Sequence, residues 1–203
     1  GNSAGTITNC YVKGNVKVNG NSYVGAITGQ ATNTIASSYT SGNININGSG
    51  YVGGLAGYIN NTVRNSFVQD VNVTSSSGKA GGFTGVFGSA ASYDKISIKG
   101  TINVSGSNCI GGYVGASDIS LSNLNANVTG TVKATSGYAG GIAGSITSSR
   151  TISNCNATMS ITGSGGNYVG GIVGYANSGT ISQCSYNGTI LSLIHISEPT
   201  RPY

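Results

Sequence analysis

The sequence is poor in the residues on which most protein chemistry depends. Its 203 residues include no tryptophan, one methionine, one histidine and four acidic residues, and only 6% of the residues are charged. The single histidine (His195), the single glutamate (Glu198) and both prolines (Pro199 and Pro202) lie near the C-terminal end. The rest of the chain therefore lacks the imidazole that most acid–base and many metal sites use.

The last thirteen residues differ in composition from everything before them. Residues 191–203, LSLIHISEPTRPY, resemble a translated sequencing adapter. We therefore treat residues 1–190 as the natural part of the chain, an internal fragment without caps, and expect residues 191–203 to be a non-native, disordered tail.

Several further classes are excluded by what residues 1–190 lack. The basic side chains are spread singly along the chain, so no stripe of positive charge is present to bind nucleic acid. No apolar run approaches the roughly 20 residues of a membrane-spanning helix. Abundant Val, Ile, Thr and Tyr also argue against disorder.

One glycine-rich unit recurs six times. Its copies are YVGAITG (23–29), YVGGLAG (51–57), KAGGFTG (79–85), CIGGYVG (109–115), YAGGIAG (138–144) and YVGGIVG (168–174). The first glycines of the copies are 28, 28, 30, 29 and 30 residues apart. A fixed period of this length is typical of a stacked repeat architecture.

Each period holds two further segments, such as TITNCYVKGNVKV (6–18) and TIASSYTSGNINI (34–46), in which polar and apolar residues alternate. This alternation predicts strands with one buried face. A single coil buries too few apolar side chains to be stable alone, so coils must stack. We predict an all-β protein, a parallel β-solenoid (β-helix) of about six coils, each with 28–30 residues and three short strands.

Stacking places equivalent residues of successive coils above one another. The first and third glycines of each unit are invariant and are predicted to be structural corner residues, with φ > 0 or with no room for a Cβ atom, whereas the middle position is Ala26 in one copy and needs only a small residue. The corner glycines are Gly25, Gly29, Gly53, Gly57, Gly81, Gly85, Gly111, Gly115, Gly140, Gly144, Gly170 and Gly174. Tyr11, Tyr39 and Phe67 are predicted to form an aromatic ladder, and Cys155 and Cys184 a ladder of reduced thiols.

The unit Y-V-G-G-[LI]-[AV]-G, with its T-I-x-x-[CS] and G-x-[IV]-x-[IV] companions, resembles the GLUG repeat of large bacterial surface and secreted proteins. The resemblance covers residues 1–190. It implies a scaffold region, found in adhesins and outside the catalytic domain of immunoglobulin-A-cleaving metallopeptidases. The zinc motif H-E-x-x-H of those peptidases is absent, so the resemblance carries no catalytic residue onto this chain.

Three aspartates are the remaining candidates for catalysis, as in β-helical enzymes that act on glycans. Asp70 precedes a predicted strand, Asp94 lies in an irregular repeat, and Asp118 takes the place of a T-I threonine, so they share no column. The cysteines lack C-x-x-C spacing, and no aspartate recurs in every coil as in calcium-binding repeats. We predict no catalytic, cofactor-binding or metal-binding residue.

Other motif matches have structural explanations. Gly48, Gly50 and Gly53 satisfy G-x-G-x-x-G, but no helix follows, and Gly170 and Gly174 fit GxxxG without an apolar 20-mer around them. A second threonine rank, as in ice-binding solenoids, is missing.

Two functions remain open. The first is a non-catalytic structural or adhesive module of a large exported protein, secreted or on the cell surface, with a glycan or surface protein as partner. The second is an accessory repeat region of a secreted enzyme, a peptidase or glycan-active enzyme, whose catalytic domain lies outside this sequence.

Overall fold

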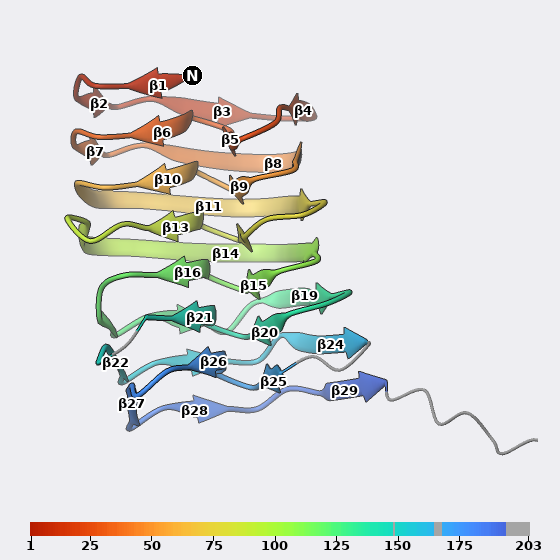
Figure 1. The fold of residues 1–203 in the computed structure, drawn as a ribbon. Helices are drawn as coiled ribbons and strands as arrows, with labels where there is room; N and C mark the ends of the chain where they lie inside the picture. The colour runs from red at the N-terminus through yellow and green to blue at the C-terminus, as the bar shows by residue number, and fades with distance from the viewer. Residues whose placement is uncertain (148, 165–167, 194–203) are drawn as a thin grey trace, which may run out of the picture.

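A computed structural model describes residues 1–147, 149–164 and 168–193. These residues form an all-β solenoid in which every strand pairs in parallel with its equivalent in the next coil (Figure 1). Paired residues are 28 to 31 positions apart, as in Tyr23↔Tyr51 and Leu121↔Ile152. The predicted fold class, a parallel β-solenoid of about six coils, is confirmed.

Three long sheets run the length of the solenoid. Sheet A contains, in spatial order, β1 (Asn2–Ser3), β6 (Thr28–Ala31), β10 (Ala56–Ile59), β13 (Thr84–Phe87), β16 (Val114–Ser117), β21 (Ala143–Ile146) and β26 (Val173–Ala176). Sheet B contains β2 (Ile7–Thr8), β7 (Ile35–Ala36), β11 (Thr62–Ser75), β14 (Ser92–Gly106), β19 (Thr129–Ala134), β24 (Ser160–Ser164) and β29 (Ile190–Leu193), with β3 (Tyr11–Lys13), β4 (Val16–Asn19) and β8 (Tyr39–Gly48) beside them. Sheet C contains β5 (Tyr23–Gly25), β9 (Tyr51–Gly53), β12 (Ala80–Gly81), β15 (Cys109–Gly111), β20 (Tyr138–Gly140) and β25 (Tyr168–Gly170).

Two short sheets complete the C-terminal coils. Sheet D contains β17 (Leu121–Ser122), β22 (Thr151–Ser153) and β27 (Thr180–Ser182), and sheet E contains β18 (Asn125–Ala126), β23 (Asn156–Ala157) and β28 (Ser185–Tyr186). The chain passes through each coil in the order A, B, C, with sheets D and E preceding sheet B in the later coils. The described residues include no helix long and apolar enough to cross a membrane.

The middle coils have three strands each, as predicted, but their strand in sheet B is long rather than short, whereas the later coils gain strands from sheets D and E. β11 and β14 run through 14 and 15 residues, so the T-I-x-x-[CS] segment and the segment after it form one strand. They pair from Thr62↔Ser92 to Ser75↔Gly106, and this ladder absorbs the bend between the two segments as a bulge at Asp70.

The end of the solenoid also differs from the predicted boundary at residue 190. β29 continues to Leu193 and pairs with β24, for example Thr162↔Leu191. Three residues of the predicted tail therefore belong to the last ladder of sheet B. The prediction of disorder for residues 194–203 lies outside the described residues.

Most of the residues with positive φ lie in two columns, and Gly137, Ser149 and Ser178 lie outside them. The first holds the residue before the [CS] position, with φ of 49° to 56°: Asn9, Ser37, Asn65, Lys95, Asn123, Asn154 and Gln183. The second holds Gly14, Gly42, Asp70, Gly100 and Gly130. These columns, rather than the glycines of the repeated unit, carry the left-handed backbone of the coils.

The core is a continuous column of aliphatic side chains along the solenoid axis. Its fully buried members include Ile44, Leu55, Ile102, Ile142 and Ile152, each with 0% of its surface exposed. Asparagine side chains bridge coils on the outside of sheet B, as in the bond of 2.9 Å from Asn103 Nδ2 to Asn72 Oδ1. Stacking is therefore held by apolar burial inside and by polar ladders outside.

Candidate functional site

The six glycine-rich units form the elbow where sheet C turns into sheet A. None of their twelve corner glycines, all of them described, has a positive φ. A Cβ atom on Gly53 would overlap the carbonyl oxygen of Ala56, and one on Gly57 would overlap that of Tyr51. The corner glycines are thus explained by crowding, because they let the backbones of sheets A and C come into contact.

The middle glycines are more restricted than the sequence indicates. A Cβ atom on Gly54, Gly82 or Gly112 would overlap the carbonyl oxygen of the equivalent residue in the next coil. Gly171 differs, because its nearest neighbours are all atoms of one side chain, that of Tyr186. The expectation that this position merely needs a small residue is therefore wrong for the interior coils.

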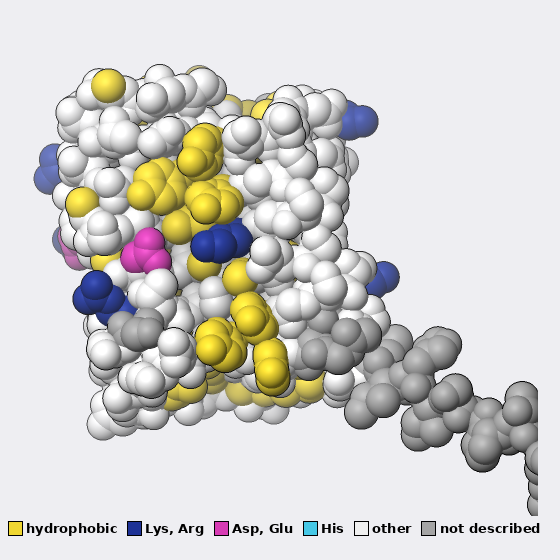
Figure 2. All heavy atoms as spheres, viewed as in Figure 1, with side chains coloured by type: hydrophobic (Ala, Val, Ile, Leu, Met, Phe, Trp, Pro, Cys, Tyr) yellow, Lys and Arg dark blue, Asp and Glu magenta, His cyan; other side chains and the backbone are white. Residues whose placement is uncertain are grey.

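Two ranks of side chains meet on the outside of this elbow, and we call them together the elbow surface. The first rank precedes the glycines and consists of Tyr23, Tyr51, Lys79, Cys109, Tyr138 and Tyr168. The second rank lies on sheet A and consists of Gln30, Tyr58, Val86, Ala116, Ser145 and Tyr175. Figure 2 shows this face as an interrupted column of hydrophobic side chains with a basic side chain near its middle.

Tyrosines gather at both ends of the elbow surface. Near the N-terminal end, the ring centroid of Tyr23 lies 5.3 Å from that of Tyr51 and 5.9 Å from that of Tyr58. Near the C-terminal end, the ring centroid of Tyr138 lies 4.7 Å from that of Tyr175 and 5.5 Å from that of Tyr168. The centroids of Tyr168 and Tyr175 are 5.9 Å apart. Tyr23 and Tyr168 expose 45% and 60% of their surface, so large aromatic rings lie on the outside of the solenoid at both ends.

The middle of the elbow surface is built from smaller side chains. Val86, Cys109 and Ala116 are buried in a cluster of their own, separate from the core. Burial raises the pKa of the Cys109 thiol, and the positive charge of Lys79 opposes that rise. The Lys79 Nζ atom lies 5.2 Å from the ring centroid of Tyr51.

Polar groups border the tyrosines. One shallow depression is lined by Ser22, Tyr23, Ser49, Gly50, Tyr51 and Ser77, and another by Tyr138, Ser145, Ile146, Thr147, Tyr175 and Asn177. Asp118 lies on the side of the second rank, where desolvation and then the Asp118 charge raise the pKa of Tyr58.

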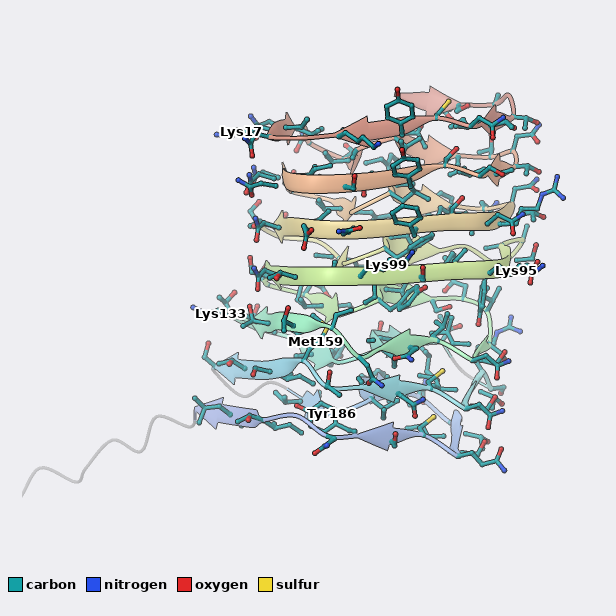
Figure 3. All side chains as sticks on the ribbon, turned by 180° about the vertical axis from the view of Figure 1, so that it is seen from behind. Lys17, Lys95, Lys99, Lys133, Met159 and Tyr186 are labelled. Carbon is teal, nitrogen blue, oxygen red and sulfur yellow. The ribbon has the colours of Figure 1, made fainter. Side chains whose placement is uncertain are left out.

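The predicted aromatic ladder lies on sheet B, away from the elbow. Tyr11 and Tyr39 stack with ring centroids 5.5 Å apart, and Tyr39 and Phe67 with centroids 4.7 Å apart. Figure 3 shows this column of rings on the face opposite to that of Figure 2, with Lys99 at its lower end. The Nζ atom of Lys99 lies 4.3 Å from the Phe67 centroid.

The cysteine position forms a polar ladder. Cys155 and Cys184 occupy neighbouring coils, since Asn156 pairs with Ser185. Each Sγ atom donates a hydrogen bond of 3.2 Å to the carbonyl oxygen two residues earlier. All four cysteines of the chain are free thiols in the structure.

The structure does not bring the three aspartates together. Asp94 pairs with Arg64 on β11, six residues before Asp70, which corresponds to about 20 Å along a strand. Paired carboxylates of glycosidases are roughly 5 to 9.5 Å apart. Asp118 lies beyond the end of β16, and Ser120, not Asp118, occupies the threonine column, because Leu121 pairs with Ile152. Among the described residues no group of three His, Cys, Asp or Glu side chains could hold a metal ion.

The repeated sequence unit marks only the first of the two ranks of the elbow surface. The first rank coincides with the first letter of the repeated unit, but Tyr58 and Tyr175 lie one residue past the third glycine and recur in only two copies. The signal that could have found them is their equal offset from Gly57 and Gly174.

Comparison with known proteins supports the fold. No family model and no curated protein sequence matches the chain. The crystal structure of a putative immunoglobulin A1 protease from Bacteroides ovatus is similar, with a TM-score of 0.61 and 21% sequence identity. The match covers 90% of this chain and 66% of that one, just under two thirds of its length. At this identity the likeness concerns the solenoid fold.

Proposed function

We propose that residues 1–190 form a non-catalytic structural and adhesive module of a large exported protein, secreted or held at the cell surface. The observation that carries the proposal is that different residues of each coil pack against neighbouring coils and face the solvent. Residues that recur in every coil hold the coils together, while large aromatic side chains such as Tyr23 and Tyr168 remain exposed on the elbow surface. Exposed aromatic clusters on a rigid scaffold are typical of binding surfaces.

The repeated unit and the likeness to the Bacteroides ovatus protein support an exported scaffold. The GLUG-like unit occurs in surface and secreted proteins, and a solenoid of a protein described as a protease has the same fold. A rod of stacked coils, with polar asparagine ladders on its outside, can extend a binding face away from a cell.

Binding to surfaces tests this function. The purified chain, applied to a glycan array and to intact host-type cells, is expected to bind at least one class of surface glycan or protein. A chain that binds none of these surfaces contradicts the adhesive role and leaves a spacer.

The distribution of carboxylates supports a role without catalysis. Asp70 and Asp94 are about 20 Å apart on sheet B, too far to act on one bond. The chain is expected to leave pectins, other acidic glycans and peptide substrates unchanged. Reproducible turnover that disappears in Asp70→Asn, Asp94→Asn or Asp118→Asn would refute this part of the proposal.

A second candidate is an accessory region of a secreted enzyme whose catalytic domain lies outside this sequence. The likeness to the putative immunoglobulin A1 protease favours it, since the match spans only part of that chain. Sequencing the gene in both directions separates the two: an anchor with further repeats supports the adhesin, and a catalytic motif such as H-E-x-x-H supports the enzyme.

A further inference from the structure

We infer that the elbow surface binds a linear glycan that carries carboxylate groups, laid along the solenoid axis with a carboxylate at Lys79. This inference rests on the proposed adhesive function and assigns it a site and a ligand class. It depends on three observations: exposed tyrosines at both ends of the surface, one basic residue between them, and the spacing of the coils.

The tyrosines suit the faces of sugar rings. Tyrosine combines an apolar ring, which packs against the C–H face of a pyranose, with a hydroxyl that exchanges hydrogen bonds with sugar hydroxyls. Tyr23 and Tyr51 at one end, and Tyr138 and Tyr168 at the other, are exposed or half-buried. The serine and threonine hydroxyl oxygens of the two depressions can accept further hydrogen bonds at the edges.

The charge between the tyrosine clusters selects an anion. Lys79 is the one basic residue in the two ranks, and it is half-buried against the Tyr51 ring. Within the described part of the chain, no carboxylate lies within the 4.0 Å of its Nζ atom that an ion pair requires. Because Asp118 lies on the side of Tyr58, a negatively charged ligand is favoured on the first rank and disfavoured on the second.

The coil spacing suits a linear chain of sugars. Tyr51, Lys79, Cys109 and Tyr138 occupy four successive coils, so about 14 Å separates the two tyrosines at about 4.8 Å per coil. One coil is close to the length of one pyranose residue in an extended glycan. If one sugar ring packs on each tyrosine cluster, the sugars between them lie over the smaller side chains in the middle of the elbow surface, beside Lys79.

The test is calorimetric titration of the full 203-residue chain with an oligogalacturonate long enough to reach from Tyr51 to Tyr168. The fully methyl-esterified oligogalacturonate of the same length is the matched neutral ligand, because it keeps the sugar backbone and removes the charges. We expect the oligogalacturonate to bind and the neutral ligand to bind at least about tenfold more weakly, as for the loss of one charge-assisted contact.

Variants locate the binding site. Lys79→Gln and Tyr168→Ala are each expected to weaken oligogalacturonate binding about tenfold. Lys133→Gln and Tyr11→Ala, which change an exposed lysine and an exposed tyrosine elsewhere, are expected to leave it unchanged. Tyr168→Phe keeps the ring and should retain most of the affinity, and circular dichroism of each variant checks that it remains folded.

The remaining outcomes overturn the inference. They are no binding of oligogalacturonate, equal binding of the neutral ligand, equal losses in Tyr11→Ala, and retention of anionic phospholipid vesicles through Lys79 in place of the sugar. If the chain still binds glycan arrays or cells while the elbow variants behave as wild type, the adhesive function stands and this site is wrong. If it binds no surface at all, both fail.

Discussion

The carboxylate of Asp70 accepts a hydrogen bond of 2.8 Å from the backbone nitrogen of Thr101 in the next coil. Asp70 has a φ of 53° and is the one residue other than glycine in its column of left-handed bends. Its side chain therefore fixes the bulge that joins the two halves of β11, although a non-glycine residue is disfavoured in this conformation.

Replacement of Asp70 should separate these two effects. Asp70→Ala keeps the unfavourable φ and loses the hydrogen bond, so it is expected to lower the free energy of unfolding by about 1–2 kcal/mol. Asp70→Asn keeps an acceptor and tolerates the left-handed conformation, so its change should stay within about 0.5 kcal/mol. Urea denaturation measures both values, and an Asp70→Asn loss as large as that of Asp70→Ala would contradict the explanation.

Lys95 offers the opposite case, a left-handed residue whose side chain makes no hydrogen bond to another residue in the described part of the chain. Its φ is 49° and its side chain is exposed. Lys95→Gly is expected to raise the free energy of unfolding by about 0.5–1 kcal/mol, because relief of the strain exceeds the entropy cost of glycine. The matched control, Lys133→Gly in the extended strand β19, should lower it by about the same amount. Losses in both variants would argue against strain at Lys95.

The buried hydroxyl of Tyr113 has no hydrogen-bond partner among the described residues. Burial also raises the pKa of Tyr113 well above its usual value. Tyr113→Phe removes an unsatisfied polar atom and is expected to raise the melting temperature by about 2–4 °C, equivalent to about 1 kcal/mol. Tyr93→Phe is the control, since the Tyr93 hydroxyl accepts from Ser122 N and donates to Ser122 O, and it should lower the melting temperature. A lower value for Tyr113→Phe would indicate a partner for that hydroxyl.

The glycines of one elbow differ in what surrounds them. A Cβ atom at Gly170 would overlap the backbone carbonyl oxygen of Val173, whereas one at Gly171 would overlap the Cβ, Cγ and Cδ1 atoms of Tyr186, a side chain that can move away by a change of χ1. Gly170→Ala is expected to cost about 3 kcal/mol and Gly171→Ala about 1 kcal/mol. Gly141→Ala, where the obstacle is the carbonyl oxygen of Gly171, should match the larger value. Equal thermal shifts at Gly170 and Gly171 would show that the ring cannot move.

The sequence predicts the solenoid because stacking makes identity repeat with the coil length. Tyr11, Tyr39 and Phe67 are 28 residues apart, and the structure stacks their rings. The left-handed bends were missed because Asn, Ser, Lys and Gln alternate in that column, so no single letter marks it. The repeated glycines are evident in the sequence, but their cause, close contact between backbones, is evident only in the fold.

The elbow surface was only partly predictable for a related reason. Its second rank is polar, aromatic or small in different coils, and no pattern connects Gln30, Tyr58 and Val86 until the strands of sheet A are paired. A surface that binds a ligand need not repeat as a core must, because each coil contacts a different part of the ligand. Binding residues in a solenoid are therefore found at equivalent positions whose identities vary.

The Cys155 thiol should make stability depend on alkaline pH. Desolvation, and then the neighbouring Cys184, raises its pKa from 9.0 to about 11, so folding favours the protonated thiol. This contribution is fully present below pH 9 and is lost as the pH rises through about 11, because the unfolded chain ionises first. Cys155→Ala is expected to flatten the fall in the free energy of unfolding over this range, measured by urea denaturation at each pH. Tyrosine ionisation is common to both proteins and cancels in the comparison.

Alkylation provides the matched control, because the same burial protects the thiol from reagents. Cys10 is exposed, whereas Cys155 is buried and donates a hydrogen bond to Ser153 O. With iodoacetamide in native buffer at mildly alkaline pH, peptide mapping should show modification of Cys10 well before Cys155, and equal rates in denaturant. Early modification of Cys155, or an identical pH dependence with and without its thiol, would contradict a buried, protonated Cys155.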